Sequence, residues 1–160
     1  MLFLNFKDIP YNLSEINPIT EYTEVRSSKI HGLGLFAKKL IPKGTVWWHA
    51  RPQDVSIMTK QQFLNLDASQ KTPLITNFLE SFLTYAYYDE ILDVLIFCLG
   101  DAKFVNHSRN ANSGTIEEHA LNAISRRDIQ PGEEITEDYT TYVISPWLEK
   151  YREYFDASCW

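Results

Sequence analysis

The chain has 160 residues, 44% of them hydrophobic and 14% aromatic, which is enough for one globular domain whose core needs no disulfide or metal. Its formal net charge of −6, with no large cluster of lysine and arginine, argues against tight binding of nucleic acid and suits a basic partner. Only two cysteines are present, Cys98 and Cys159, so a disulfide framework and a four-cysteine zinc site are excluded. We therefore assign no metal ligands.

The N-terminal run MLFLNFKDIPYN carries a lysine and an aspartate too early for a signal peptide, and no apolar run is long enough to cross a bilayer. We expect an intracellular protein, in the cytoplasm or the nucleus, that binds neither a membrane nor nucleic acid directly. Pro10 and Pro18 predict an irregular lead-in over residues 1–21, with room for one short strand.

Two glycines flank a leucine in the run His31 to Ala37, HGLGLFA, and an apolar strand follows. This pattern is typical of a backbone that bends sharply or approaches a ligand closely, although a plain hairpin turn has the same signature. Pro42-Lys43-Gly44 predicts the next turn, and Thr45 to His49 the next strand. Its two tryptophans are expected on opposite faces, one in the core and one at an edge or a groove.

Two short helices are predicted in the middle of the chain. Thr59 to Gln62 matches a capping box, with Phe63 and Leu66 directed inward. Thr72-Pro73 supplies an N-cap and a proline at the first helical position of the second helix. The apolar residues that follow recur at helical spacing and predict a stripe facing the core: Leu74, Ile75, Phe78, Leu79, Phe82 and Leu83.

A hairpin is predicted from two strands, residues 85–89 and 91–99, closed near Asp89-Glu90. Strand alternation places Tyr85 and Tyr87 on one face and Tyr88 on the other. Beyond it, the run Lys103 to Gly114 puts Asn, His and Ser side chains where the chain leaves apolar residues and enters a loop, which is where binding sites tend to lie.

The C-terminal third continues with predicted strands over residues 115–118 and 119–126, a turn at Pro131-Gly132, and the run GEEITEDY that ends at Tyr139. Ser145-Pro146 again pairs an N-cap with a proline and predicts a helix over residues 147–155. One side of that helix carries aromatic residues: Trp147, Tyr151, Tyr154 and Phe155. The elements together predict a mainly β domain with a few short helices.

Three motifs in this order, GLGLFA, FVNHS with the later Asn112, and GEEITEDY, resemble the SET domain of protein lysine methyltransferases over roughly residues 22–142. The resemblance implies a SET fold of small curved sheets, in which the NHS segment and the segment ending in the tyrosine pass each other in a knot-like crossing that forms the active site. Residues 143–160 would then form an aromatic C-terminal helix or tail that packs on this domain.

The resemblance also implies S-adenosylmethionine as the cofactor, with S-adenosylhomocysteine as its product. Matching positions give the cofactor-binding set His31, Gly32, Leu33, Gly34, Asn106, His107, Tyr139 and Trp147. Trp147 enters because the cysteine-rich segment that follows many SET domains is absent, and the aromatic tail could supply a ring to stack on adenine. The alternative for this tail is a helix that docks its apolar side on the core.

The same matching makes Tyr139 the central catalytic residue, with Tyr85 and Tyr87 as further residues of a lysine channel; spacing alone does not choose between these two and Tyr88. The implied reaction is an in-line transfer of a methyl group to a neutral lysine amine. Because free lysine has a pKa of about 10.4, the amine must first lose a proton, and a narrow aromatic channel would favour its neutral form.

The sequence departs from the family's NHS-Cys-x-Pro-Asn pattern at Arg109 and Ala111, and the aromatic residue usual shortly after Asn112 is absent. The number of methyl groups transferred therefore stays open. Singly, the motif residues also fit ordinary roles in loops and cores. We expect a lysine methyltransferase acting on a basic protein or peptide such as a histone tail. A weakly active or inactive SET-fold protein-binding module is the alternative, and a different amine acceptor is a third possibility.

Overall fold

The computed structural model describes residues 16–69, 71–115 and 122–156. Its strands are Thr23–Ser27 (β1), Leu33–Ala37 (β2), Val46–His49 (β3), Val55–Thr59 (β4), Ala86–Asp89 (β5), Val94–Cys98 (β6), Asn106–His107 (β7), Ser113–Thr115 (β8), Asn122–Ser125 (β9) and Glu134–Glu137 (β10). Its α-helices are Ile19–Tyr22 (α1), Lys60–Ala68 (α2) and Pro73–Tyr85 (α3), and its 3-10 helices are Asp101–Phe104 (η2), Tyr139–Thr141 (η3) and Pro146–Tyr154 (η4). The predicted fold class, small sheets with a few short helices, is confirmed.

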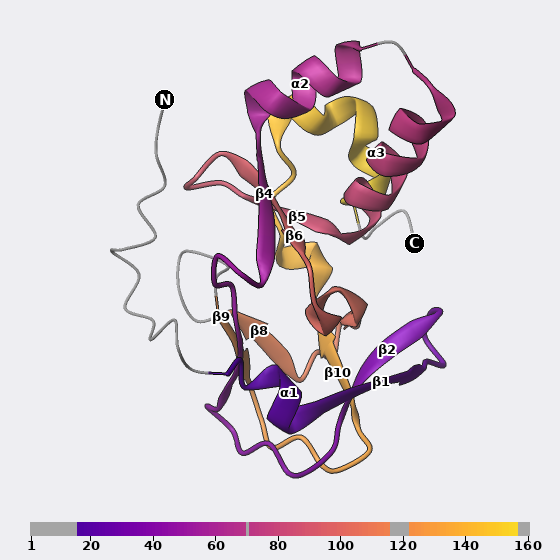
Figure 1. The fold of residues 1–160 in the computed structure, drawn as a ribbon. Coiled ribbons are helices and arrows are strands. Elements are labelled where there is room, and N and C mark those ends of the chain that lie inside the picture. Colours follow the sequence, from indigo (N-terminus) through magenta and orange to yellow (C-terminus); the bar gives the residue numbers. More distant parts are fainter. Residues whose placement is uncertain (1–15, 70, 116–121, 157–160) are drawn as a thin grey trace.

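The strands form three small sheets, with the orders β1-β2-β10-β7, β3-β9-β8 and β4-β6-β5. In Figure 1, α2, α3 and the yellow C-terminal segment gather at one end of the molecule, β1, β2 and β10 lie at the other, and β4 to β6 run between them. The C-terminal end of strand β10 therefore lies in the middle of the molecule, on the side that faces α2 and α3.

Two chain segments that are distant in sequence meet where β7 runs parallel to β10. Asn106 lies opposite Thr136, and His107 lies opposite Glu137. The buried side chain of Asn112 adds a second link, because its amide donates to the Glu134 carbonyl at 2.7 Å and its oxygen accepts from the Thr136 N–H at 2.9 Å. The crossing of the NHS segment and the segment ending in Tyr139 is therefore present.

Two hydrophobic clusters fill the interior. One contains both adjacent tryptophans, Trp47 at 1% exposure and Trp48 at 6%. Neither covers an exposed edge, but both also line a pocket, as the groove alternative predicted for one of them. A β-bulge re-aims the chain between Val46 and Trp48. The second cluster lies among the β4-β6-β5 sheet, the two longer helices and η4.

Both predicted helix starts are confirmed. The Thr59 hydroxyl accepts from the Gln62 N–H, and the Gln62 side chain accepts from the Thr59 N–H, which completes the capping box. The Thr72 hydroxyl accepts from the Ile75 N–H at the start of α3.

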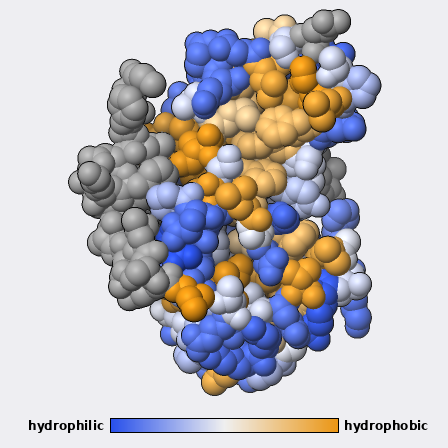
Figure 2. All heavy atoms as spheres, viewed as in Figure 1, coloured by the Kyte–Doolittle hydropathy of each residue, from blue (hydrophilic) through white to orange (hydrophobic). Residues whose placement is uncertain are grey.

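The predicted core-facing stripe of α3 is only half right. Its later residues are buried, namely Leu79, Phe82 and Leu83. Its earlier residues are not, since Leu74 is 78% exposed and Phe78 45% exposed. Ile75, also in the first half of the helix, is partly buried against the second cluster, so the departure from the prediction is confined to Leu74 and Phe78. Apolar surface gathers over the helical end of the face in Figure 2.

The predicted hairpin exists with different bounds. Tyr85 ends α3 instead of starting a strand, and β6 begins at Val94 after a turn in which Asp93 has a φ of 50°. Aspartate tolerates this left-handed conformation better than most residues. The third strand of this sheet, β4, was not predicted, because its sequence VSIMT lacks clear alternation.

The ends of the chain fit the predictions in part. Most of the lead-in over residues 1–21, with its one possible short strand, lies outside the described residues, and Ile19–Tyr22 at its end is a helical turn. The predicted strand over residues 119–126 is confirmed as β9, Asn122–Ser125. The one predicted over residues 115–118 overlaps β8 only at Thr115, and the rest of it falls within residues 116–121, outside the described part.

The C-terminal helix is confirmed as η4, a 3-10 helix with a break at Tyr151. It docks on α2 through rings: Phe63 contacts Trp147 and Tyr151 at centroid distances of 5.5 and 5.6 Å. Leu148 is fully buried beneath them. The tail therefore packs on the domain as expected.

Asp67, near the end of α2, holds this tail against the helix through hydrogen bonds. Its carboxylate accepts bonds from the Tyr151 hydroxyl, Lys71 and Lys150. These bonds, that of Tyr151 first, lower the pKa of Asp67 to about 2. The pKa in an unfolded chain is about 3.9, so the stability that these bonds contribute is complete above about pH 4 and is lost as the pH falls through about 2.

Replacement of Asp67 with asparagine should therefore lower the free energy of unfolding at pH 7 by about 1 kcal/mol, since solvent screens a carboxylate at this position. The difference from the wild type should shrink between pH 4 and pH 2. Urea unfolding at several pH values measures both effects. Glu80→Gln, at an exposed position on α3, is the control and should show neither. A constant difference at all pH values would contradict the assignment.

Candidate active site

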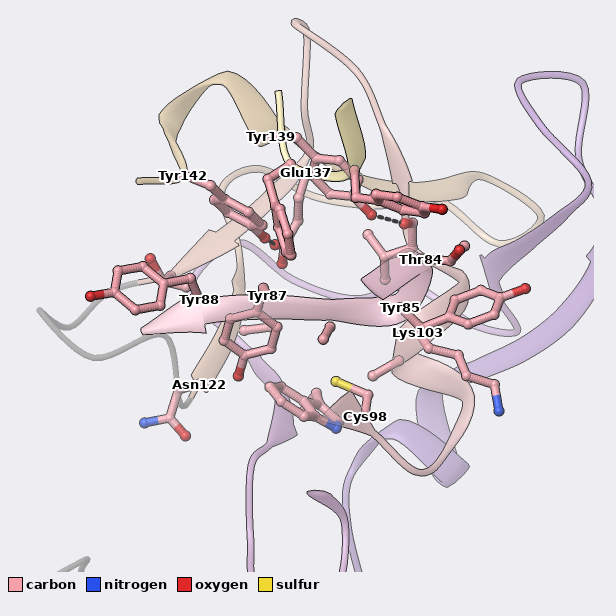
Figure 3. Close-up of a pocket in the computed structure, with 18 of the residues that line it drawn as sticks. Thr84, Tyr85, Tyr87, Tyr88, Cys98, Lys103, Asn122, Glu137, Tyr139 and Tyr142 are labelled. Carbon is pink, nitrogen blue, oxygen red and sulfur yellow. Dashed lines mark hydrogen bonds between the residues drawn. The ribbon is translucent and has the colours of Figure 1, made fainter. Parts of the chain in front are cut away.

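A pocket opens between β5, the end of β10 and the C-terminal tail, and its walls are mainly aromatic (Figure 3). The aromatic residues that line it are Trp47, Trp48, Tyr85, Tyr87, Tyr88, Tyr139, Tyr142, Tyr154 and Phe155. Such walls suit an aliphatic chain that ends in an amine, because rings cover the chain and interact favourably with a cation. All three tyrosines predicted around residue 87 lie here, Tyr88 included.

Tyr139 stands where the pocket meets the strand crossing. Its hydroxyl donates to the Val105 carbonyl, and its ring stacks on Tyr142 with centroids 5.2 Å apart. Burial, and then the charge of Glu137, raises the pKa of Tyr139 above its ordinary value. The phenol therefore keeps its proton near neutral pH and acts as a hydrogen-bond donor, not as a base.

His107 connects Tyr139 to the other strand. The Tyr139 N–H donates to His107 Nδ1 at 3.1 Å, so in the neutral ring the proton lies on Nε2. Asp138 Oδ1 approaches the same Nδ1 at 3.9 Å, but no bond forms there because this nitrogen already accepts one. His107 thus presents Nε2–H as a donor.

The glycine turn lies beside Asn106. The Asn106 amide donates to the carbonyls of Leu33 and His31, at 3.0 and 3.2 Å, and to the Glu134 carboxylate at 2.8 Å. Gly34 has no room for a side chain, since a Cβ would lie 2.3 Å from that carboxylate. Asn106 therefore fastens the turn to β10.

The turn also leaves backbone accessible. Gly32 has a φ of 44°, which favours glycine, and no atom lies within 4 Å of the place where its Cβ would be. His31, Gly32 and Leu33 are all exposed. An open surface beside exposed backbone groups can accept a polar ligand.

Most of the predicted site residues are brought together in two adjoining groups. The turn residues 31–34 lie with Asn106 and His107, and the pocket contains Tyr85, Tyr87 and Tyr139. Trp147 lies apart from both: its indole N–H donates to Asp93 at 2.8 Å and its ring packs on Phe63. The tail reaches the pocket through Tyr154 and Phe155 instead, which the same predicted face contained.

Glu137 and Tyr142 are pocket residues that were not predicted from the sequence. The Tyr142 hydroxyl donates to Glu137 Oε2, and the Ser113 hydroxyl donates to Oε1 at 3.3 Å. Burial raises the pKa of Glu137. Strand alternation gave no signal for Glu137, because β10 ends at this residue and Tyr139 begins η3.

The described part of the chain contains no group of three or more His, Cys, Asp or Glu side chains that could hold a metal ion. None of its helices is both long and apolar enough to span a bilayer.

Solved structures of histone lysine methyltransferases have a similar fold. The methyltransferase domain of human histone-lysine N-methyltransferase SETMAR matches at 19% identity with a TM-score of 0.52, over 74% of this chain and 44% of that one. The Neurospora SET domain protein DIM-5, a histone lysine methyltransferase, matches at 17% identity with a TM-score of 0.54, over 79% of this chain and 56% of that one. These likenesses establish the fold.

The sequence leads to the same class. A model of the SET domain matches residues 32–140, which is more than half of the chain, so the protein belongs to the SET domain family. The matched range runs from Gly32 in the glycine turn to just past Tyr139, and so contains both groups of candidate site residues except His31, Tyr142, Tyr154 and Phe155. No curated protein matches the sequence.

Proposed function

We propose that this protein transfers a methyl group from S-adenosylmethionine to the side-chain amine of a lysine in a protein substrate. The observation that carries the proposal is the aromatic pocket around Tyr139, which adjoins the glycine turn through the pairing of β7 with β10. One group can hold the methyl donor and the other the acceptor, side by side. Such positioning is most of what this transfer requires.

The residues at the turn fit the cofactor, which when bound supplies a methyl group activated on a sulfonium. Exposed backbone at residues 31–33 and the Nε2–H of His107 offer groups to a zwitterionic, adenine-bearing ligand. Asn106 holds the turn in shape by its three bonds. We therefore assign the turn and His107 to binding, and Asn106 to fixing the turn.

The pocket fits the acceptor. Its rings would surround the methylenes of a lysine, and desolvation there disfavours the ammonium form. Tyr139 directs its hydroxyl along the wall, where it can orient the amine. The chain's net charge of −6 favours substrates whose target lysine lies in a basic segment, a histone tail among them.

Calorimetric titration with S-adenosylhomocysteine tests the cofactor assignment. We expect binding to the wild type and an affinity at least about tenfold lower in Asn106→Ala, because about 1.4 kcal/mol corresponds to a factor of ten and three bonds are lost. Asn110→Ala is the matched control: it is exposed in the same loop and should bind as the wild type does. No heat of binding from the wild type would remove the basis of the proposal.

Incubation with S-adenosylmethionine labelled on the methyl group, together with core histones and ribosomal proteins as probes, tests the transfer. Mass spectrometry then maps the modified residue. Methylation on lysine supports the proposal, and methylation on another residue type would replace the acceptor. Binding of the cofactor without transfer to any probe would favour a protein-binding module in place of an enzyme.

A further inference from the structure

Glu137 is an acidic residue in a buried and mainly aromatic pocket, where acidic side chains are uncommon. Its side chain is 8% exposed and lines a pocket whose other walls are mainly rings. A carboxylate loses hydration there, which costs free energy unless the charge has a role or strong partners. In Figure 3 it lies between Tyr139 and Tyr142, at the wall that holds the proposed catalytic tyrosine.

The carboxylate is held in a fixed orientation. Each of its oxygens accepts a hydrogen bond from a hydroxyl group: Oε2 from that of Tyr142 and Oε1 from that of Ser113. Ser113 is itself fixed, because the Trp47 indole N–H donates to its oxygen at 2.8 Å. A carboxyl group that accepts bonds on both oxygens is built to carry a negative charge, while its burial opposes that charge.

The other groups that line this pocket leave Glu137 as its proton acceptor. Among the described residues that line the pocket, it is the only carboxylate, and Lys103 is a cation. Burial raises the pKa of the Cys98 thiol to about 12 and the pKa values of Tyr139 and Tyr142 above that of a free phenol. Arg126, acting through space, favours the charged form of Glu137.

We propose, on the basis of the function above, that Glu137 takes the proton from the ammonium group of the substrate lysine. One N–H bond of the ammonium breaks, its electron pair stays on nitrogen, and the proton forms an O–H bond with the Glu137 carboxylate. Two buried charges become two neutral groups, which a poorly hydrated pocket favours. The amine then has the lone pair that methyl transfer needs, and Glu137 returns the proton to water after the product leaves.

Infrared difference spectroscopy tests the proton transfer without turnover. The probe is n-butylammonium, which has the chain and charge of a lysine side chain, added to the protein saturated with S-adenosylhomocysteine. The wild type should gain the carbonyl band of a protonated carboxyl group, and Glu137→Gln should not. The proposal is overturned by an unchanged carboxylate band in the wild type, or by a carbonyl band that persists in Glu137→Gln.

The rate of methyl transfer to core histones, measured from pH 6 to pH 9, provides the second test. Glu137→Gln should be about 10²–10⁴-fold slower at pH 7, the range typical of general-base catalysis. Its rate should rise about tenfold per pH unit, because the free-amine fraction of lysine does so below its pKa of about 10.4. The wild-type rate should level off, and Glu137→Asp should recover part of it.

Controls separate chemistry from folding. Glu80→Gln, the same substitution at an exposed site, should follow the wild-type pH profile. Thermal unfolding and affinity for S-adenosylhomocysteine should stay near the wild-type values in Glu137→Gln. An equal loss of rate at every pH would assign Glu137 a structural role and contradict the proposal. A wild type that methylates no probe, yet protonates Glu137 on binding butylammonium, would instead count against the proposed function.

Discussion

Replacement of Tyr139 with phenylalanine should lower the rate of methyl transfer by about 10²–10³-fold, which is the loss usually seen when one positioned donor is removed from an active site. The ring stays and keeps its stacking on Tyr142 and its contact with His107. Only the hydroxyl and its bond to the Val105 carbonyl are lost. The change therefore isolates the proposed orientation of the amine.

Three measurements define this result. Affinity for S-adenosylhomocysteine should stay within about twofold, because the glycine turn is untouched, and the free energy of unfolding should fall by about 1 kcal/mol for one hydrogen bond. Tyr22→Phe, outside the pocket, is the matched control and should transfer methyl groups at the wild-type rate. A Tyr139→Phe rate within threefold of the wild type would contradict the catalytic assignment.

Replacement of Phe63 with alanine should lower the free energy of unfolding by about 3–5 kcal/mol, since it removes a fully buried ring and leaves a cavity. The lost contacts join α2 to the C-terminal tail, through Trp147 and Tyr151. Denaturation in urea measures the change, and Phe63→Leu should recover more than half of it.

The neighbouring Leu64 provides the control, because it is 37% exposed and Leu64→Ala should cost less than about 1 kcal/mol. Phe63→Ala should also speed amide hydrogen exchange over residues 146–155 more than exchange in β2. Uniformly faster exchange would mean that the ring supports the whole fold and not the tail in particular. A loss of stability below 1 kcal/mol would contradict the packing described here.

Local sequence signals were sufficient where one or two neighbours decide the structure. The Thr59 and Thr72 caps, the bend at Gly32 and the docking of the tail all follow from residue types at fixed spacing. The order of three motifs then predicted that Asn106 and Tyr139 would belong to one site, and they lie in adjoining groups joined by His107.

Other features depend on contacts that the sequence does not encode locally. Strand alternation separates Tyr87 from Tyr88, yet both line the pocket, because it reaches both sides of β5. Trp147 and Tyr154 share a predicted face, and the contacts of Trp147 with Phe63 and Asp93, both distant in sequence, decide that it packs against α2. Glu137 would look like one more charge in an acidic run until β10 is placed against Ser113.

The pairing of β7 with β10 also has a consequence for how the site comes into being. Asn106 and His107 are held by Thr136 and Glu137, about thirty residues later in the chain. Contacts of such sequence separation form only after a long loop has closed, and both the turn side and the pocket side depend on them. Both halves of the site therefore depend on one pairing between distant parts of the chain, and a change that weakens the pairing of β7 with β10 should disturb cofactor side and pocket side together.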